Sequence, residues 1–121
     1  MTKLDHIGFI VSDLEKSLAF YQKLFGFKVV KRFTFGTSNI VLLDVGDGLL
    51  ELIQRPGPGT PPVENRSHIA LLEPDFDEKV KTLGKMGVEK RLIDGDNGDR
   101  LCFFQDPDGH TLELTELGLG S

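Results

Sequence analysis

Hydrophobic and polar residues follow the same plan twice along the chain. In the first half, a short apolar segment with the pattern of a strand precedes a segment whose apolar residues recur at helical spacing. Three more segments with strand patterns follow, separated by glycine-containing turns. The predicted elements of this half are a strand at 4–11, a helix at about 12–26, and strands at 27–35, 38–45 and 48–55. The pattern therefore predicts a βαβββ module.

The predicted helix of this module has signals at both ends. Ser12 and Glu15 have the S-x-x-E spacing of a capping box, which predicts that the helix opens at Ser12. Gly26 is expected to end it. Its apolar stripe, which should face the core, consists of Leu14, Leu18, Tyr21 and Phe25.

The second half repeats the plan after a segment rich in proline and glycine, which reads as a linker at 57–65. Each half alone is too small to bury much core, so we expect the modules, about 4–56 and 66–117, to form one domain over 1–121. The predicted elements of the second module are a strand at 66–73, a helix at about 75–86 carrying Phe76, Val80 and Leu83, strands at 88–93, 100–105 and 110–116, and turns at 94–98 and 106–109.

A pair of candidate metal ligands is duplicated with the modules. His6 is followed 45 positions later by Glu51, and His68 is followed 45 positions later by Glu113, so the second pair lies 62 positions after the first. Neighbouring residues repeat in the same register, which favours a fused pair of modules. Two neutral imidazoles and two carboxylates suit one divalent ion of the zinc, nickel, cobalt, manganese or iron group.

Strand alternation predicts that each glutamate points to the face of its sheet opposite its neighbouring leucines. Glu51 shares a face with Arg55, and the leucines on either side of Glu51 and of Glu113 point to the opposite face. The apolar faces are expected to pack on the helices. The carboxylates would then lie on the helix-free faces, where two curved half-sheets could form a cleft around a metal. His110, three residues before Glu113, is interpreted as a turn residue.

Arg55 has two interpretations. It follows Glu51 by four residues, about 13 Å at the rise of a strand. It could bind the anionic tail of a substrate, or it could be the solvated end of a strand.

Composition and charge narrow the classes of partner. Of the 121 residues, 39% are hydrophobic and 27% charged, and the net charge is −5 with no basic stripe. This balance argues against nucleic acid or an anionic membrane as a partner, and no segment is apolar enough for a membrane span. The first residues do not have the pattern of a signal peptide. The single cysteine, Cys102, reads as an apolar filler of a strand and suits a reducing compartment, so we expect a cytoplasmic protein.

These residues resemble the vicinal oxygen chelate superfamily and, within it, glyoxalase I (lactoylglutathione lyase). The resemblance covers nearly the whole chain and implies an α+β fold of two tandem βαβββ modules, the glyoxalase/bleomycin resistance/dioxygenase fold. The motifs that carry it are Leu4-Asp5-His6-Ile7, Asp13 to Ser17 with Phe20-Tyr21, Leu24 to Phe27, Leu50-Glu51-Leu52, Ser67 to Leu71, and Asp106 to Gly109 with Leu112-Glu113-Leu114.

The resemblance also implies a site and a reaction. His6, Glu51, His68 and Glu113 would be the ligands of an octahedral nickel, cobalt or zinc ion with two open positions. The substrate would be the hemithioacetal of methylglyoxal and a thiol, which passes through an enediolate to a 2-hydroxyacyl thioester. Glu113 matches the family's base, and Glu51 is the second carboxylate. A homodimer is implied by the resemblance alone.

Several alternatives stay open. The bacterial glutathione enzyme carries an arginine where this chain has Ile10 and an asparagine where it has Arg55, so the identity of the thiol is open. A methylmalonyl-CoA epimerase-like enzyme would use related chemistry on a thioester, but usually carries glutamine at the place of Glu51. An antibiotic-binding protein of the bleomycin-resistance type would lack the metal. Extradiol dioxygenases and fosfomycin-resistance enzymes need three ligands, which would leave Glu51 surplus. The site could be built within one chain or across a dimer.

Overall fold

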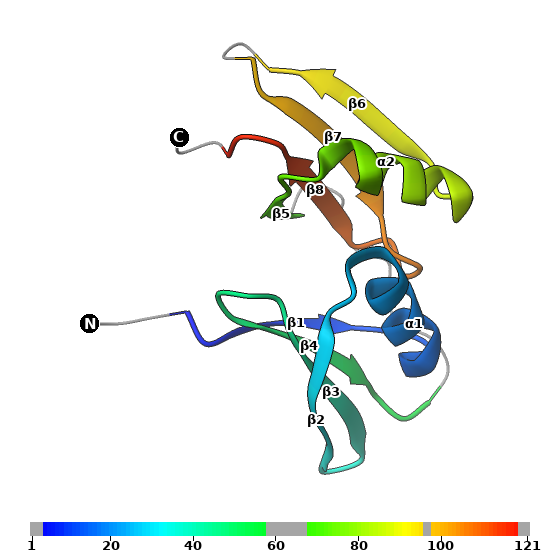
Figure 1. Cartoon of the computed structure of the whole chain (residues 1–121). Helices are drawn as coiled ribbons and strands as arrows, with labels where there is room; N and C mark the ends of the chain where they lie inside the picture. The colour runs from blue at the N-terminus through cyan, green and yellow to red at the C-terminus, as the bar shows by residue number, and fades with distance from the viewer. Residues whose placement is uncertain (1–3, 58–67, 96–97, 119–121) are drawn as a thin grey trace. The chain divides into compact units, whose positions relative to one another are not determined.

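The computed structural model describes residues 4–57, 68–95 and 98–118 (Figure 1). The chain divides into two compact units, Met1–Pro62 and Val63–Ser121. Within the described residues each unit has the predicted βαβββ order, so the α+β class is confirmed. The elements are β1 (His6–Ile10), α1 (Leu14–Phe25), β2 (Lys28–Phe35), β3 (Ser38–Asp44) and β4 (Leu49–Gln54), then β5 (His68–Leu72), α2 (Phe76–Lys85), β6 (Lys90–Asp94), β7 (Arg100–Gln105) and β8 (Thr111–Thr115). The predicted linker beyond Gly57 and residues 96–97 of the predicted turn lie outside the described residues.

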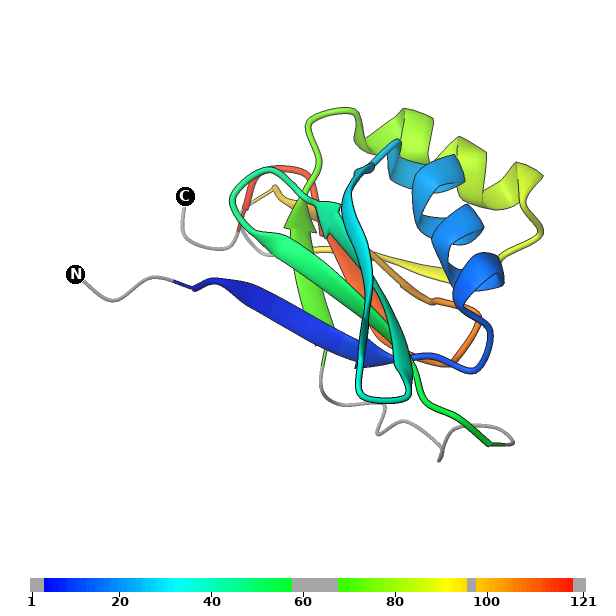
Figure 2. The same ribbon diagram turned by 90° about the horizontal axis from the view of Figure 1, so that it is seen from below.

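Each unit contains a four-stranded mixed sheet with the same topology. The strand order is β1-β4-β3-β2 in the first unit and β5-β8-β7-β6 in the second. In each sheet the first strand runs parallel to the last strand of its unit, and the other pairs are antiparallel (Figures 1 and 2). The two parallel ladders also share one register, since Gly8 is opposite Glu51 and Ala70 is opposite Glu113.

The start of α1 differs from the prediction by one residue. Asp13, not Ser12, is the N-cap, and its side chain accepts a hydrogen bond from the backbone N–H of Lys16 at 3.1 Å. Aspartate caps a helix as well as serine does. A residue of β4 also stabilises the start at Leu14, because Gln54 Oε1 accepts a hydrogen bond from the backbone N–H of Leu14 at 2.8 Å. The predicted end is confirmed: Gly26 has a φ of 71°, which glycine adopts without steric cost.

The core of the first unit lies between α1 and its sheet. Leu14, Leu18 and Tyr21 of the predicted stripe are buried, but Phe25 is only half-buried and Leu24 takes the buried place. Phe25 instead stacks on Phe27, with ring centroids 4.7 Å apart. The helix has 3.6 residues per turn, so Leu24, three residues after Tyr21, can face the core as readily as Phe25, four residues after it.

Burial follows the predicted alternation along β4, whereas in β8 all four residues from Leu112 to Thr115 are buried, Glu113 included. Leu50 and Leu52 are buried while Glu51 is half-buried, and Leu112 and Leu114 are buried on either side of Glu113. In the second unit the apolar face also buries Phe76 and Leu83 of α2, whereas Val80 is half-buried. Cys102 is buried there, and burial raises the pKa of its thiol, as expected for an apolar filler.

Arg100 ties three elements of the second unit together. Its Nε and Nη2 donate to the two carboxylate oxygens of Glu116 at 3.0 and 2.7 Å, and its Nη1 and Nη2 donate to those of Asp77 at 2.9 and 3.1 Å. The guanidinium also lies 4.8 Å from the ring centroid of Phe76. These bonds to Arg100 lower the pKa of both carboxylates. The network connects the start of α2, β7 and the residue after β8.

Asp99 is the buried carboxylate from which we predict a pH dependence of stability. It accepts from Thr115 Oγ1 at 2.5 Å and from the backbone N–H of Leu117 at 2.8 Å, and these bonds lower its pKa. A lowered pKa in the folded state means that the ionised group stabilises the fold at neutral pH, and that this contribution is lost as the pH falls below about 4. Wild type should therefore be more stable than Asp99→Asn at pH 7, and the difference should shrink on acidification.

Urea denaturation of both proteins between pH 7 and pH 3 measures this difference. A stability gap that stays constant over the whole range would show that the charge on Asp99 does not contribute.

Candidate metal centre

The first unit brings His6 and Glu51 together on neighbouring strands. His6 Nε2 lies 3.6 Å from Glu51 Oε1. The contact follows from the register of β1 on β4: Glu51 is opposite Gly8, so His6, two residues earlier on the same face, is its diagonal neighbour. Both side chains are partly exposed, with 45% of the His6 and 18% of the Glu51 side chain accessible, so a ligand can reach them.

Asp5 orients the imidazole of His6. Asp5 Oδ2 lies 2.8 Å from His6 Nδ1, and this hydrogen bond is the main cause of a raised His6 pKa. When the imidazole is neutral, a proton on Nδ1 that is held by Asp5 leaves the lone pair on Nε2, which faces Glu51. A carboxylate behind an imidazole is the usual arrangement at metal-binding histidines. Sequence reasoning missed this role of Asp5.

The second unit repeats the pair with a more enclosed carboxylate. His68 Nε2 lies 3.4 Å from Glu113 Oε1, and the register of Ala70 opposite Glu113 matches that of the first unit. The Glu113 side chain is 9% accessible, half the value of Glu51. Phe103 is opposite Glu113 on the next strand, and its ring meets that of His68 edge to face at 6.0 Å. The aromatic ring shields one side of this pair.

A small residue opposite each glutamate keeps the two pairs open. A Cβ at Gly8 would lie 3.0 Å from Glu51 Oε1, closer than side chains normally approach. Gly8 therefore leaves room for the carboxylate of Glu51 in its observed position. Ala70 holds the equivalent place in the second unit.

We expect Gly8→Val to push the carboxylate of Glu51 away from His6. The backbone of Gly8 does not have a positive φ, so the strand itself tolerates a side chain there. Metal affinity, measured by competition with a chelator, should fall roughly tenfold, the size of effect found when the support of a ligand is lost. Ala70→Gly is the matched control and should leave the affinity nearly unchanged. Equal affinities of Gly8→Val and wild type would show that the observed position of Glu51 does not matter for the metal.

The structure thus pairs the four candidate ligands two by two. Within residues 4–57, 68–95 and 98–118, no group of three or more His, Cys, Asp or Glu side chains is close enough together to hold a metal ion. The chemistry of each pair still fits a divalent ion, because an imidazole nitrogen and a carboxylate oxygen face each other at distances that an ion could bridge after a small adjustment.

The other candidate residues lie around these pairs. Arg55 is exposed and follows the last residue of β4. Ile10, at the end of β1, is half-buried and shares the face of His6 by alternation. His110 precedes β8, and its backbone N–H donates to Asp106 Oδ1 at 2.9 Å, as expected of a turn residue.

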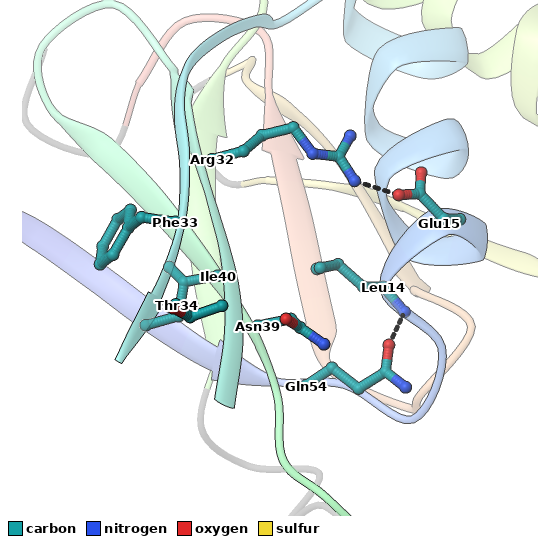
Figure 3. Close-up of a pocket in the computed structure, with 8 residues that line it drawn as sticks. All are labelled: Leu14, Glu15, Arg32, Phe33, Thr34, Asn39, Ile40 and Gln54. Atoms are coloured by element: carbon teal, nitrogen blue, oxygen red, sulfur yellow. Dashed lines mark hydrogen bonds and ion pairs between the residues drawn. The ribbon is translucent and has the colours of Figure 1, made fainter. Parts of the chain in front are cut away.

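A pocket of the first unit lies on the opposite face of its sheet from Glu51. Its volume is about 440 Å³, and it is bounded by the start of α1 and the adjoining ends of β2, β3 and β4 (Figure 3). Gln54 and Arg32 point into it, whereas Phe33 points away. Polar groups of this pocket already bind one another, since Arg32 pairs with Glu15 and Gln54 with the backbone of Leu14. The pocket is therefore separate from the His6 and Glu51 pair.

The comparison with known proteins agrees with the fold. Residues 3–114 match the Glyoxalase/Bleomycin resistance protein/Dioxygenase superfamily, and the chain belongs to this family. It is similar to the uncharacterized protein YwkD of Bacillus subtilis, with 34% identity over 96% of this chain and 98% of that protein. It is also similar to the metallothiol transferase FosB of Lysinibacillus sphaericus, with 34% identity over 92% of this chain and 79% of that protein.

Among solved structures, the trypanothione-dependent glyoxalase I of Leishmania major is similar to the chain with a TM-score of 0.82 and 26% identity, over 96% of this chain and 87% of that one. The family includes many enzymes, and its members commonly bind a divalent metal.

In the part of the chain that the structure describes, no helix is long and apolar enough to cross a membrane.

Proposed function

We propose that the chain is a divalent-metal-dependent lyase of the glyoxalase I type, which converts the hemithioacetal of an α-oxoaldehyde such as methylglyoxal and a thiol to a 2-hydroxyacyl thioester. The observation that carries the proposal is the duplicated contact of His Nε2 with Glu Oε1, at 3.6 Å in the first unit and 3.4 Å in the second. The pair keeps the same register in both modules, with Glu51 opposite Gly8 and Glu113 opposite Ala70.

His6, Glu51, His68 and Glu113 would together hold one ion, nickel, cobalt or zinc. Two ligands seldom hold such an ion firmly, and the two pairs complete a set of four. The pairs would combine either within one chain or across a homodimer. When bound, the ion would supply positive charge to two adjacent oxygens of the substrate.

Glu113 is proposed to move the proton from the carbon next to the carbonyl. Its carboxylate is the more enclosed of the two, and a base that is shielded from water transfers protons to carbon more effectively than a solvated one. Glu51, which is more accessible, would serve mainly as a ligand and as the second carboxylate of the reaction. Asp5 would keep the Nε2 of His6 directed at the site.

Arg55 is proposed to bind the far end of the substrate. It is exposed beyond the end of β4, on the side of the sheet that alternation assigns to Glu51. A charge so far from the reacting carbons would contribute to substrate binding more than to the chemical step. Because Arg55 and Ile10 differ from the residues of the bacterial glutathione enzyme at these places, the identity of the thiol stays open. We also propose that the protein acts in the cytoplasm on small molecules.

The similarity to a metallothiol transferase favours one second candidate. The chain is 34% identical to FosB. In this second function, the same two His and Glu pairs would activate a molecule to which a thiol is added, instead of a hemithioacetal. A transferase that needs three protein ligands would keep its metal affinity without Glu51. The proposed lyase would bind its metal more weakly without it.

A substrate panel distinguishes these functions. Nickel-, cobalt- and zinc-loaded protein would be assayed with methylglyoxal and several thiols, with methylmalonyl-CoA, and with fosfomycin and the same thiols. The proposal expects thioester formation from methylglyoxal with at least one thiol, dependent on the metal. Epimerisation of methylmalonyl-CoA or addition of a thiol to fosfomycin, without thioester formation, would replace it.

A further inference from the structure

Arg91 lies on the same face of the second sheet as Glu113, two strands away. In the register of this sheet Arg91 is opposite Phe103, and Phe103 is opposite Glu113. Directly opposite residues point to the same face, so the three side chains form a row across β6, β7 and β8. Neighbouring strands are about 4.8 Å apart, which places the backbone of Arg91 about 10 Å from that of Glu113.

The environment of Arg91 differs from that of the arginines that support the fold. Arg32 pairs with Glu15, and Arg100 pairs with Asp77 and Glu116. Both of these arginines lie on the faces that pack against the helices, opposite the glutamate ligands, as the register of their strands shows. Their charges are used to attach the helices α1 and α2 to the sheets.

Arg91, in contrast, points to the ligand face and contacts an aromatic ring. Its guanidinium lies 5.6 Å from the ring centroid of Phe103, and β6 is exposed along its length. Among the described residues no carboxylate forms an ion pair with it. Stacking on a ring fixes the plane of a guanidinium while leaving its N–H donors available. An arginine held in this way is ready to bind an anion.

The first unit has a counterpart at the equivalent distance. Lys31 is opposite Leu42, which is opposite Glu51, and the Lys31 ammonium lies 5.0 Å from the ring centroid of Phe33. Each module therefore places a cation, supported by an aromatic ring, two strands from its glutamate. The two cations are not related by the 62-residue repeat of the sequence, and a bulge between Val29 and Lys31 brings the lysine to its face.

We propose that Arg91, stacked on Phe103, binds an anionic group of the substrate, and therefore that the substrate carries a carboxylate or phosphate some 10 Å from its reacting carbons. The identity of the reaction rests on the proposed function, but the anion site does not. The guanidinium offers the paired N–H groups that match the two oxygens of such an anion, and Phe103 provides an apolar floor between it and the reacting end. This class includes thiols and thioesters with an acidic tail and excludes neutral small thiols as preferred partners.

A comparison of charged and neutral thiols tests the proposal through turnover. Hemithioacetals of methylglyoxal with 6-mercaptohexanoate, whose carboxylate can reach about 9 Å from the reacting carbons, and with the neutral 6-mercaptohexan-1-ol of similar length would be assayed on wild type, Arg91→Gln and Lys90→Gln. Lys90 is the matched control, because it is the neighbouring residue on the other face of β6 and its loss changes the net charge equally. Arg91→Gln should lower the preference in kcat/KM for the anionic adduct roughly tenfold, chiefly through KM. Lys90→Gln should keep the preference, and an unchanged preference in Arg91→Gln would overturn the proposal.

A binding measurement keeps the test independent of the reaction. Zinc-loaded protein labelled with ¹⁵N would be titrated with 3-(methylthio)propionate and, separately, with its neutral amide. The carboxylate should shift the Nε–H signal of Arg91 and the amide signal of Phe103, and the neutral probe should not. These shifts without turnover of any adduct would leave the anion site standing and reject the proposed function. Equal shifts with both probes, or none at Arg91, would reject the anion site.

Discussion

Glu113→Gln protein that is saturated with metal is expected to turn over at least ~10²-fold more slowly than wild type, the usual contribution of a positioned base. Glutamine keeps an oxygen donor and nearly the same shape, so it can still act as a ligand. It cannot accept the proton from the substrate carbon. Because the side chain is well enclosed, water is poorly placed to replace it. Metal affinity should fall as well, so the comparison requires matched occupancy.

Glu51→Gln is the matched control for this prediction. Glu51 makes the same contact with its histidine but is twice as accessible, so its loss should be milder. The measurement is exchange of the substrate's α-proton with solvent deuterium, which reports the proton transfer alone. Exchange at nearly the wild-type rate in loaded Glu113→Gln would show that Glu113 is not the base. Equal losses in both variants would show that the carboxylates share the transfer.

Removal of either histidine is expected to lower metal affinity by at least ~10²-fold, more than the loss of a supporting group does. His6→Ala and His68→Ala should have similar effects although they lie in different units, because each would take one of four ligands from the same ion. The affinity would be measured by chelator competition, with far-UV circular dichroism as the check on folding. His110→Gln is the matched control, since His110 belongs to neither pair. If one of the alanine variants kept the wild-type affinity, the metal would be held by the other pair alone.

Most of the fold could be predicted from local patterns. Alternation along β4 and β8 correctly placed Glu51 and Glu113 on the face opposite the leucines on either side of them. These leucines are buried, and a shift of the strand by one residue would expose them. The start of α1 could not be predicted as well. Ser12 and Asp13 are both good caps, and the choice depends on Gln54, which is 40 residues away in the sequence and satisfies the backbone of Leu14.

The candidate site could be predicted in part, for a related reason. The repeat identified the four candidate ligands, and the structure places His6 beside Glu51 and His68 beside Glu113; their meeting at one ion stays a prediction. Arg91 and Phe103 were missed because their relation to Glu113 depends on the pairing of three strands, which no local spacing encodes. Asp5 was missed because a charged residue beside a histidine is common, and only the 2.8 Å hydrogen bond distinguishes it.

The number of ions bound by the wild-type chain tests the central claim most directly. Elemental analysis after loading with nickel or zinc and removal of excess metal would give this number. If both pairs supply ligands to one centre, about one ion per chain is expected, whether the centre lies within a chain or is shared in a dimer. Two ions per chain would show that each His and Glu pair binds its own metal, and no retained ion would show that the pairs are not a metal centre; either result would contradict the account.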